Sequence, residues 1–297
     1  MARMNSGYSG AAERPLILRV VSFPLVALVV AVLLFLFASA LGLYLGKFVP
    51  SWGQPGSLIA QTAISLGLIL ATYKLAIARL GAEPQDDLPV HGALRNIGVG
   101  LAVGALLFSG VVAIAAALGV YRISGDGDAS RLIQQAISAA IAPAIVEELL
   151  FRGILFRWIE ELAGSWAGLV VSSALFGLAH IMNPGATWFS SFCIFVEAGL
   201  LLGGAYMLTR SLWMPIALHF AWNFVQGAVF GLPVSGHPAS GLVRAELQGP
   251  TLLSGGTFGL EASVIALVIA GAAGVWLVIR AVRRGALIQP WWVRRRA

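Results

Sequence analysis

Long apolar runs recur along this chain, and they restrict its fold more than any other feature. Residues 23–45, for example, contain no charged side chain. About 20 apolar residues are needed for a helix that crosses a hydrocarbon layer of roughly 30 Å. On this criterion we predict eight transmembrane helices, at residues 19–46, 57–80, 94–119, 132–160, 165–182, 188–209, 212–231 and 260–282.

The composition agrees with a membrane protein and excludes a soluble domain. Hydrophobic residues make up 59% of the chain and charged residues 11%, whereas soluble domains have roughly 25% charged residues. The net charge of +6 could indicate nucleic-acid binding, but arginines gather at the two ends of the chain, beside apolar runs. Flanking charges of this kind anchor helices on the cytoplasmic side. We therefore predict a multi-pass protein of the cell membrane with both termini cytoplasmic and no nucleic-acid partner.

The chain shows no internal repeat that would divide it. We predict a single transmembrane domain at residues 19–282, preceded by a cytoplasmic tail, residues 1–18, and followed by a basic tail, residues 283–297. Cys193 is the only cysteine, so an intrachain disulfide is excluded.

The second half of the chain places ionisable residues inside predicted helices. A charged side chain costs about 2.5–3.5 kcal/mol at the centre of a membrane helix, so such residues usually serve a function. Glu197 lies in the sixth predicted helix, where we expect an interhelical hydrogen bond. The others form three motifs: Glu147-Glu148-x-x-x-Arg152, Phe176-x-x-x-His180 and His219-x-x-x-Asn223.

Helical spacing separates the two neighbouring glutamates. Glu148 and Arg152 are four residues apart and share one helix face, so we expect them to form an ion pair. Glu147 is rotated by about 100° from Glu148 and is left without that partner. Pro143 lacks a backbone N–H and should kink the helix just before the pair. We therefore expect Glu147 to be the carboxylate that acts chemically.

The two histidines complete a candidate hydrolytic site. His219 and Asn223 are again four residues apart, as are Phe176 and His180. A carboxylate, two imidazoles and an amide are sufficient to activate a water molecule and to stabilise an oxyanion. Each group alone could be a structural contact between helices, but the combination on three helices favours catalysis.

The motifs resemble those of the CAAX prenyl endopeptidase and bacteriocin-processing family, also called the CPBP or Abi family. The resemblance covers roughly residues 135–227, which carry the three motifs in order. It implies an all-α polytopic membrane fold of eight helices around a polar intramembrane cavity. The implied activity is that of an intramembrane endopeptidase that uses a glutamate-activated water.

The resemblance also implies roles for individual residues. Glu147 and His180 would activate the water, and His219 and Asn223 would stabilise the oxyanion. Among the supporting residues, Arg152 would hold Glu148 and Phe176 would line the cavity wall.

The same residues are compatible with other chemistry. Glu147, His180 and His219 could form a three-ligand zinc site, although the resemblance favours a site without a metal or other cofactor. A membrane immunity or scaffold protein, or a proton-coupled transporter, could also use intramembrane Glu and His residues. For a protease, the expected partners are the lipid bilayer and a membrane-associated peptide or protein substrate, prenylated or not.

Overall fold

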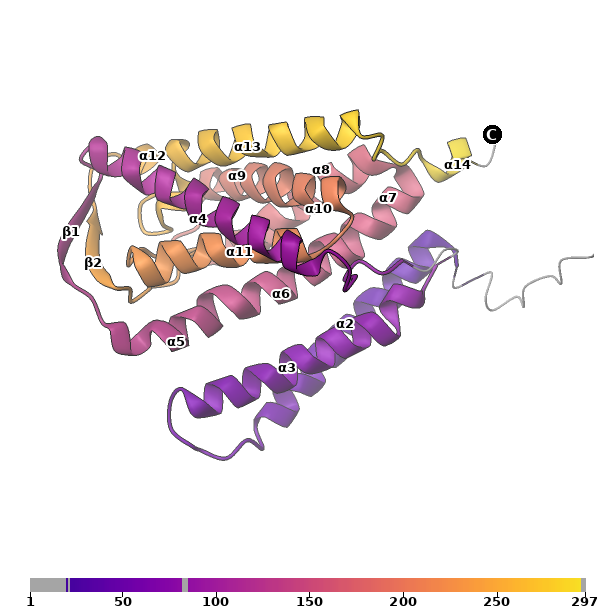
Figure 1. Cartoon of the computed structure of the whole chain (residues 1–297), viewed down its shortest axis with the longest axis horizontal. Coiled ribbons are helices and arrows are strands. Elements are labelled where there is room, and N and C mark those ends of the chain that lie inside the picture. Colours follow the sequence, from indigo (N-terminus) through magenta and orange to yellow (C-terminus); the bar gives the residue numbers. More distant parts are fainter. Residues whose placement is uncertain (1–19, 21, 82–84, 295–297) are drawn as a thin grey trace, which may run out of the picture.

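The structure is a computed structural model that describes residue 20, residues 22–81 and residues 85–294. Most of its helices lie along one common direction (Figure 1). The tail predicted at residues 1–18 lies outside the described residues, as do residues 295–297 of the basic tail.

Within the described ranges, six helical segments are long and apolar enough to cross a membrane, judged by length and composition. The chain is therefore a polytopic, mostly helical membrane protein. The segments are Pro24–Gly46 (α2), Gly56–Arg79 (including α3, Gly56–Leu75), Ala93–Ala117 (α4), Ser165–Met182 (including α8, Ser165–Ala179), Trp188–Thr209 (including α9, Trp188–Val196, and α10, Gly203–Thr209) and Val264–Arg283 (α13).

The other two predicted spans are helical but differ from these six. Residues 132–163 carry the charged motif and contain π-helical segments between α5 (Leu132–Gln135), α6 (Ala142–Glu148) and α7 (Arg157–Ala163). α11 (Trp213–Phe224) has only 12 residues, and a π-helical segment of 5 residues extends it. Six spans, rather than the predicted eight, therefore qualify by length and composition in the described part of the chain.

Pro143 lies where the regular α-helix is interrupted. It lies at the start of α6, directly after the π-helical segment Ala136–Ile141. Because proline cannot donate the usual i→i−4 hydrogen bond, a wider π-helical turn with i→i+5 bonding is one way to continue the helix. A second π-helical segment, Leu149–Phe156, follows α6. The two glutamates thus lie on a short α-helical segment between two wide turns.

A small antiparallel sheet was missed by the all-α prediction. β1 (Tyr121–Asp126) pairs with β2 (Val243–Leu247), with Tyr121 opposite Leu247 and Asp126 opposite Val243. The sheet lies at one end of the helices, near the four-residue helix α12 (Thr251–Ser254) (Figure 1). Both strands lie in connections outside the apolar runs. Their backbone groups are therefore not satisfied by a long helix, and pairing satisfies them.

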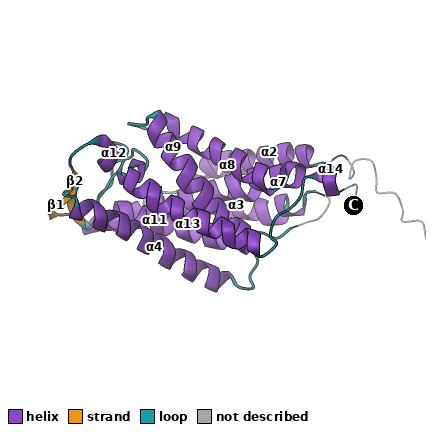
Figure 2. Cartoon of the chain, turned by 90° about the horizontal axis from the view of Figure 1, so that it is seen from above, coloured by secondary structure: helices purple, strands orange, loops and turns teal. Residues whose placement is uncertain are grey.

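Close packing of α4 against α11 fixes the helix that carries His219. A Cβ atom on Gly100 would lie 2.6 Å from the carbonyl oxygen of Met214, and one on Gly104 would lie 2.9 Å from the Cβ of Ala221. Only glycine allows this approach, as is typical of small-residue helix contacts in membranes. Figures 1 and 2 both show the two helices side by side.

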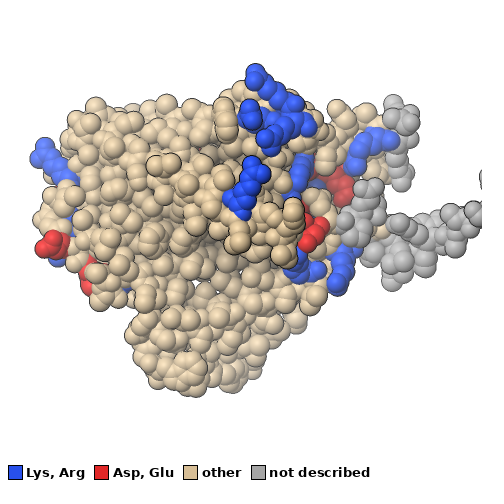
Figure 3. Space-filling model, in the orientation of Figure 1, with Lys and Arg blue, Asp and Glu red and all other residues tan. Residues whose placement is uncertain are grey.

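Charged side chains are unevenly distributed on the surface. Figure 3 shows most of the basic and acidic atoms in the half of the molecule that carries the C-terminal helix α14 (Trp291–Arg294), with a smaller group at the sheet end. The hairpin of α2 and α3 is almost free of them on this face. A long apolar surface with charged ends is the arrangement expected for helices that span a bilayer.

Candidate active site

Glu148 is the centre of a buried network. Its Oε1 accepts a hydrogen bond from Nη1 of Arg152 at 2.7 Å, and the same oxygen lies 3.1 Å from Nδ1 of His219. The side chains of Glu148 and Arg152 are 0% and 1% exposed. The ion pair expected from the sequence is present, and it extends to a histidine from α11 that the spacing argument had not connected to it.

Arg152 also joins this network to two other helices. Its Nη2 donates to the carbonyl oxygen of Ala198, and its guanidinium lies 4.8 Å from the ring centre of Phe176. Phe176 packs edge-on against Phe151, with ring centres 4.7 Å apart. Phe176 therefore supports the buried cation in addition to lining a cavity wall.

Glu147 differs from Glu148 in its surroundings. Its side chain is 28% exposed, whereas that of Glu148 is 0% exposed; Oε2 of each glutamate is buried without a hydrogen-bond partner in the described part of the chain. The nearest basic nitrogen is Nε2 of His219, at 4.0 Å. His219 therefore faces Glu148 with one ring nitrogen and Glu147 with the other. The carboxylate that the sequence left unpaired is the one that remains available.

The tautomer of His180 follows from its hydrogen bond. Its Nδ1 lies 2.8 Å from the carbonyl oxygen of Phe176. Because a carbonyl oxygen can only accept, Nδ1 must donate, and Nε2 of a neutral ring carries the free lone pair. The two rings also lie close together, with centres 4.7 Å apart at an angle of 30°. Phe176 thus orients His180 through its backbone and through its ring.

The amide of Asn223 is oriented by a backbone contact. Its Nδ2 donates to the carbonyl oxygen of Ala139 at 3.0 Å, in the π-helical segment before Pro143. This bond identifies the nitrogen end of the amide and occupies one of its two N–H groups. The second N–H remains for a ligand, so this amide offers one donor rather than two.

One cavity brings the four predicted catalytic residues together. It has a volume of about 600 Å³, and Glu147, His180, His219 and Asn223 all line it. Pro143 and Asn183 also line it. His180 comes at the end of α8 rather than in the middle of a helix, yet the fold places it in the same cavity as Glu147.

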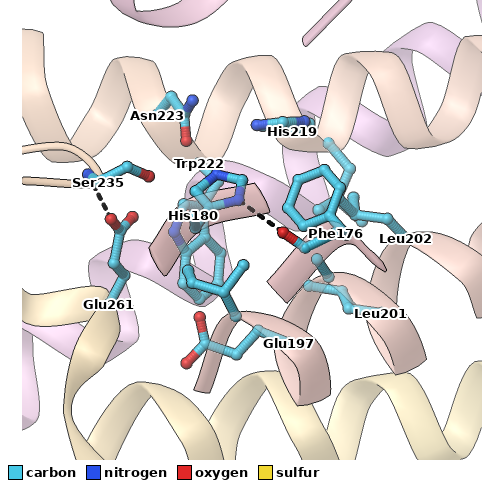
Figure 4. A pocket seen from close by; sticks show the side chains of 13 residues that line it. Phe176, His180, Glu197, Leu201, Leu202, His219, Trp222, Asn223, Ser235 and Glu261 are labelled. Atoms are coloured by element: carbon cyan, nitrogen blue, oxygen red, sulfur yellow. Dashed lines mark hydrogen bonds between the residues drawn. The ribbon is translucent and has the colours of Figure 1, made fainter. Parts of the chain in front are cut away.

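A second, smaller cavity of about 50 Å³ adjoins the first one (Figure 4). His180, His219, Asn223 and Ser235 line both cavities. Glu197 faces the smaller one, and its Oε1 is buried without a partner among the described residues. The interhelical hydrogen bond expected for Glu197 is therefore not formed. The reason is that its carboxyl points into a cavity rather than at a neighbouring helix.

Glu261 also lines the smaller cavity and was missed from the sequence. It lies in the short 3-10 helix Leu260–Ala262, just before α13, and accepts a hydrogen bond from the backbone N–H of Ser235. Burial raises the pKa of the Glu261 carboxyl to about 7. The only signal available was an acidic residue at the edge of the last apolar run, which does not indicate contact with residue 235.

The donor set does not favour the zinc alternative. Within the described ranges, no group of three or more His, Cys, Asp and Glu side chains is arranged to hold a metal ion. Glu147 and His219 approach each other only to 4.0 Å, and Nδ1 of His219 is directed at Glu148. A site without metal stays a prediction.

Comparison with known proteins matches the segment that carries most of the residues lining this cavity. Residues 129–225 match the family described as "Type II CAAX prenyl endopeptidase Rce1-like". The matched segment contains all three motifs. Over this segment, about a third of its length, the chain is similar to the Rce1-like family. The resemblance stated from the motifs is thereby confirmed for these residues.

Two curated proteins resemble this Rce1-like chain. The "Putative membrane peptidase YdiL" of Bacillus subtilis (strain 168) is 25% identical over 193 residues, which cover 60% of this chain and 76% of that protein. An "Uncharacterized 24.3 kDa protein" of Escherichia coli is 28% identical over 154 residues, covering 48% of this chain and 69% of that protein. No solved structure matches the chain.

Proposed function

We propose that this Rce1-like protein is an intramembrane endopeptidase that hydrolyses a peptide bond with a water molecule activated by Glu147. One observation carries the proposal. Glu147 has a partly exposed carboxylate, 28% exposed, and it lines a cavity that His180, His219 and Asn223 also line. A general base needs an available lone pair and room for water and substrate, and this cavity offers both.

The first step is proton transfer to Glu147. A water held between the carboxylate of Glu147 and Nε2 of His180 loses a proton to that carboxylate, and its oxygen attacks the peptide carbonyl carbon. His180 can accept a hydrogen bond from this water because its Nδ1 donates to Phe176. Glu147 and His180 together therefore fix the position of the attacking water, and Glu147 takes its proton.

The second step places negative charge on the former carbonyl oxygen. His219 and Asn223 are the available donors, through Nε2–H of an imidazolium and the second N–H of the amide. A protonated His219 also balances the site, since Glu147, Glu148, Arg152 and His219 then carry no net charge. Neutrality matters here because an uncompensated buried charge is strongly unfavourable.

The final step breaks the C–N bond. The protonated Glu147 returns its proton to the nitrogen of the leaving amine as the tetrahedral intermediate collapses. The products are a carboxylic acid and an amine, and Glu147 is again a carboxylate. Glu147 thus accepts the proton of the water and delivers it to the leaving amine.

A second groove on α6 is a candidate site for the membrane-associated part of a substrate. A groove of about 450 Å³ lies between the α2–α3 hairpin and α6, and Ala142 and Val146 form its α6 wall. Val146 directly precedes Glu147 in the chain. The groove is mostly apolar, with a few polar side chains such as Gln61 and Thr62. It suits a peptide attached to, or embedded in, the bilayer.

The test is cleavage of a peptide library by purified protein in detergent. Glu147→Gln should lower turnover by roughly 10²–10⁴-fold, the usual contribution of a general base, with little change in melting temperature. Glu246→Gln removes an exposed carboxyl in β2 and is the matched control, which should cleave like wild type. Wild-type turnover by Glu147→Gln would exclude this mechanism. Peptide binding without cleavage by wild type would favour a scaffold or immunity role.

A further inference from the structure

A groove far from Glu147 combines apolar walls with arginines at one end. It has a volume of about 430 Å³ and lies between α4, α10, α11 and α13. Arg95 of the first turn of α4 and Arg284, directly after α13, lie on it. Its remaining lining residues are Asn96, Val99, Val103, Leu208, Thr209, Met214, Ala273, Trp276 and Leu277.

The arginines of this groove lack acidic partners. No carboxylate lines the groove, and neither Arg95 nor Arg284 forms an ion pair in the described part of the chain. Arg280 lies 5.6 Å from the ring centre of Trp276, a half-exposed residue of the groove. Figure 3 shows basic atoms over the end of α13 and the start of α4, with no acidic atom between them. The arginines of the groove are therefore available to bind an anion from outside the chain.

The position of the charges relative to the apolar walls indicates the kind of anion. Both α4 and α13 are candidate membrane spans, and the arginines lie at their ends. Val99 and Val103 follow Arg95 by about one and two helical turns, on the membrane side of the charge. A molecule that fills the groove therefore presents an anionic group at the end of the helices and an apolar part along them.

We infer that this groove binds an anionic phospholipid, with the headgroup phosphate between Arg95 and Arg284 and an acyl chain along Val99 and Val103. Guanidinium groups match phosphate oxygens in charge and in planar geometry. Basic pockets between transmembrane helices recognise anionic lipid headgroups in this way. Trp276 is suited to the interface because its ring is amphipathic. A free phosphate ion would use the arginines but leave the apolar walls unfilled.

The test measures lipid binding, so it is independent of peptide cleavage. Purified protein in neutral detergent is titrated with phosphatidylglycerol or with phosphatidylcholine, and melting temperature and bound lipid in native mass spectra are recorded. Phosphatidylglycerol should raise the melting temperature more than phosphatidylcholine. One arginine near an anionic headgroup favours binding about fivefold, so the Arg95→Gln/Arg284→Gln double variant should lose on the order of 25-fold in affinity.

The control variant removes two arginines from the opposite end. Arg122→Gln/Arg244→Gln changes the charge equally, in the exposed strands β1 and β2, and should bind phosphatidylglycerol like wild type. Equal binding by the groove double variant, when it melts like wild type without lipid, would overturn the proposal. So would an equal stabilisation by inorganic phosphate or by the water-soluble glycerophosphoglycerol headgroup, because the apolar groove would then have no role.

Discussion

Nδ1 of His219 lies 3.1 Å from Oε1 of Glu148, so the buried glutamate rather than the catalytic candidate orients this imidazole. Glu148 thereby holds both Arg152 and His219, while the side chain of its neighbour Glu147 is 28% exposed and lines the cavity. Two adjacent glutamates thus have different roles because successive helical residues point about 100° apart.

Loss of Arg152 should destabilise the protein more than loss of a surface arginine. Arg152→Ala leaves the buried Glu148 without its cation, which typically costs about 3–5 kcal/mol. Arg131→Ala breaks an exposed pair with Asp128, for which about 0–1 kcal/mol is expected. Thermal unfolding in detergent compares the two variants. Peptide cleavage should also fall with Arg152→Ala, because Glu148 orients His219 as well. Equal stability of Arg152→Ala and wild type would show that the ion pair contributes nothing to stability.

Burial of Glu261 predicts a pH dependence of stability. Its folded-state pKa of about 7 lies above the usual value of 4.5, so the folded protein binds this proton more tightly than the unfolded chain does. The favourable contribution is complete below the unfolded pKa and is lost as the pH rises through about 7, amounting to about 3 kcal/mol for this shift.

The measurement is the melting temperature in detergent between pH 5 and pH 8, for wild type and Glu261→Gln. The melting temperature of Glu261→Gln should rise relative to that of wild type as the pH rises. The exposed Glu246→Gln control should run parallel to wild type. Parallel curves for wild type and Glu261→Gln would mean that the carboxyl stays charged throughout this range.

Metal removal should leave the activity intact. In the proposed mechanism a carboxylate accepts the proton and two donors stabilise the oxyanion, so no metal ion is needed. Peptide cleavage should survive prolonged treatment with a strong chelator, and elemental analysis should find substoichiometric zinc. Stoichiometric zinc that leaves and returns together with the activity would instead assign Glu147, His180 and His219 as ligands.

The predicted orientation can be tested with single cysteines. Cys193 is buried, and Cys193→Ser provides a background without thiols. In this background, Gln248→Cys should react with an impermeant thiol reagent on intact cells, because residues 232–258 are expected outside. His91→Cys should react only after permeabilisation. Both positions are exposed in the structure, so the reverse pattern would invert the orientation.

Much of this protein could be predicted from local sequence. Apolar runs indicate membrane helices because each must satisfy its backbone hydrogen bonds internally. The Glu148–Arg152 pair follows from a four-residue spacing on one helix. The family resemblance likewise follows from motifs that are each five or six residues long.

Other features depend on contacts between segments far apart in the chain. His219 reaches Glu148 across 71 residues, and Glu261 meets Ser235 across 26. Asp87, in a connection that reads as an ordinary polar loop, is buried between the hydroxyls of Tyr73 and Tyr206, each at 2.8 Å. Helical periodicity describes which residues share a face. Which faces meet depends on packing, for example on the close approach that Gly100 allows between α4 and α11, and only the tertiary structure decides that.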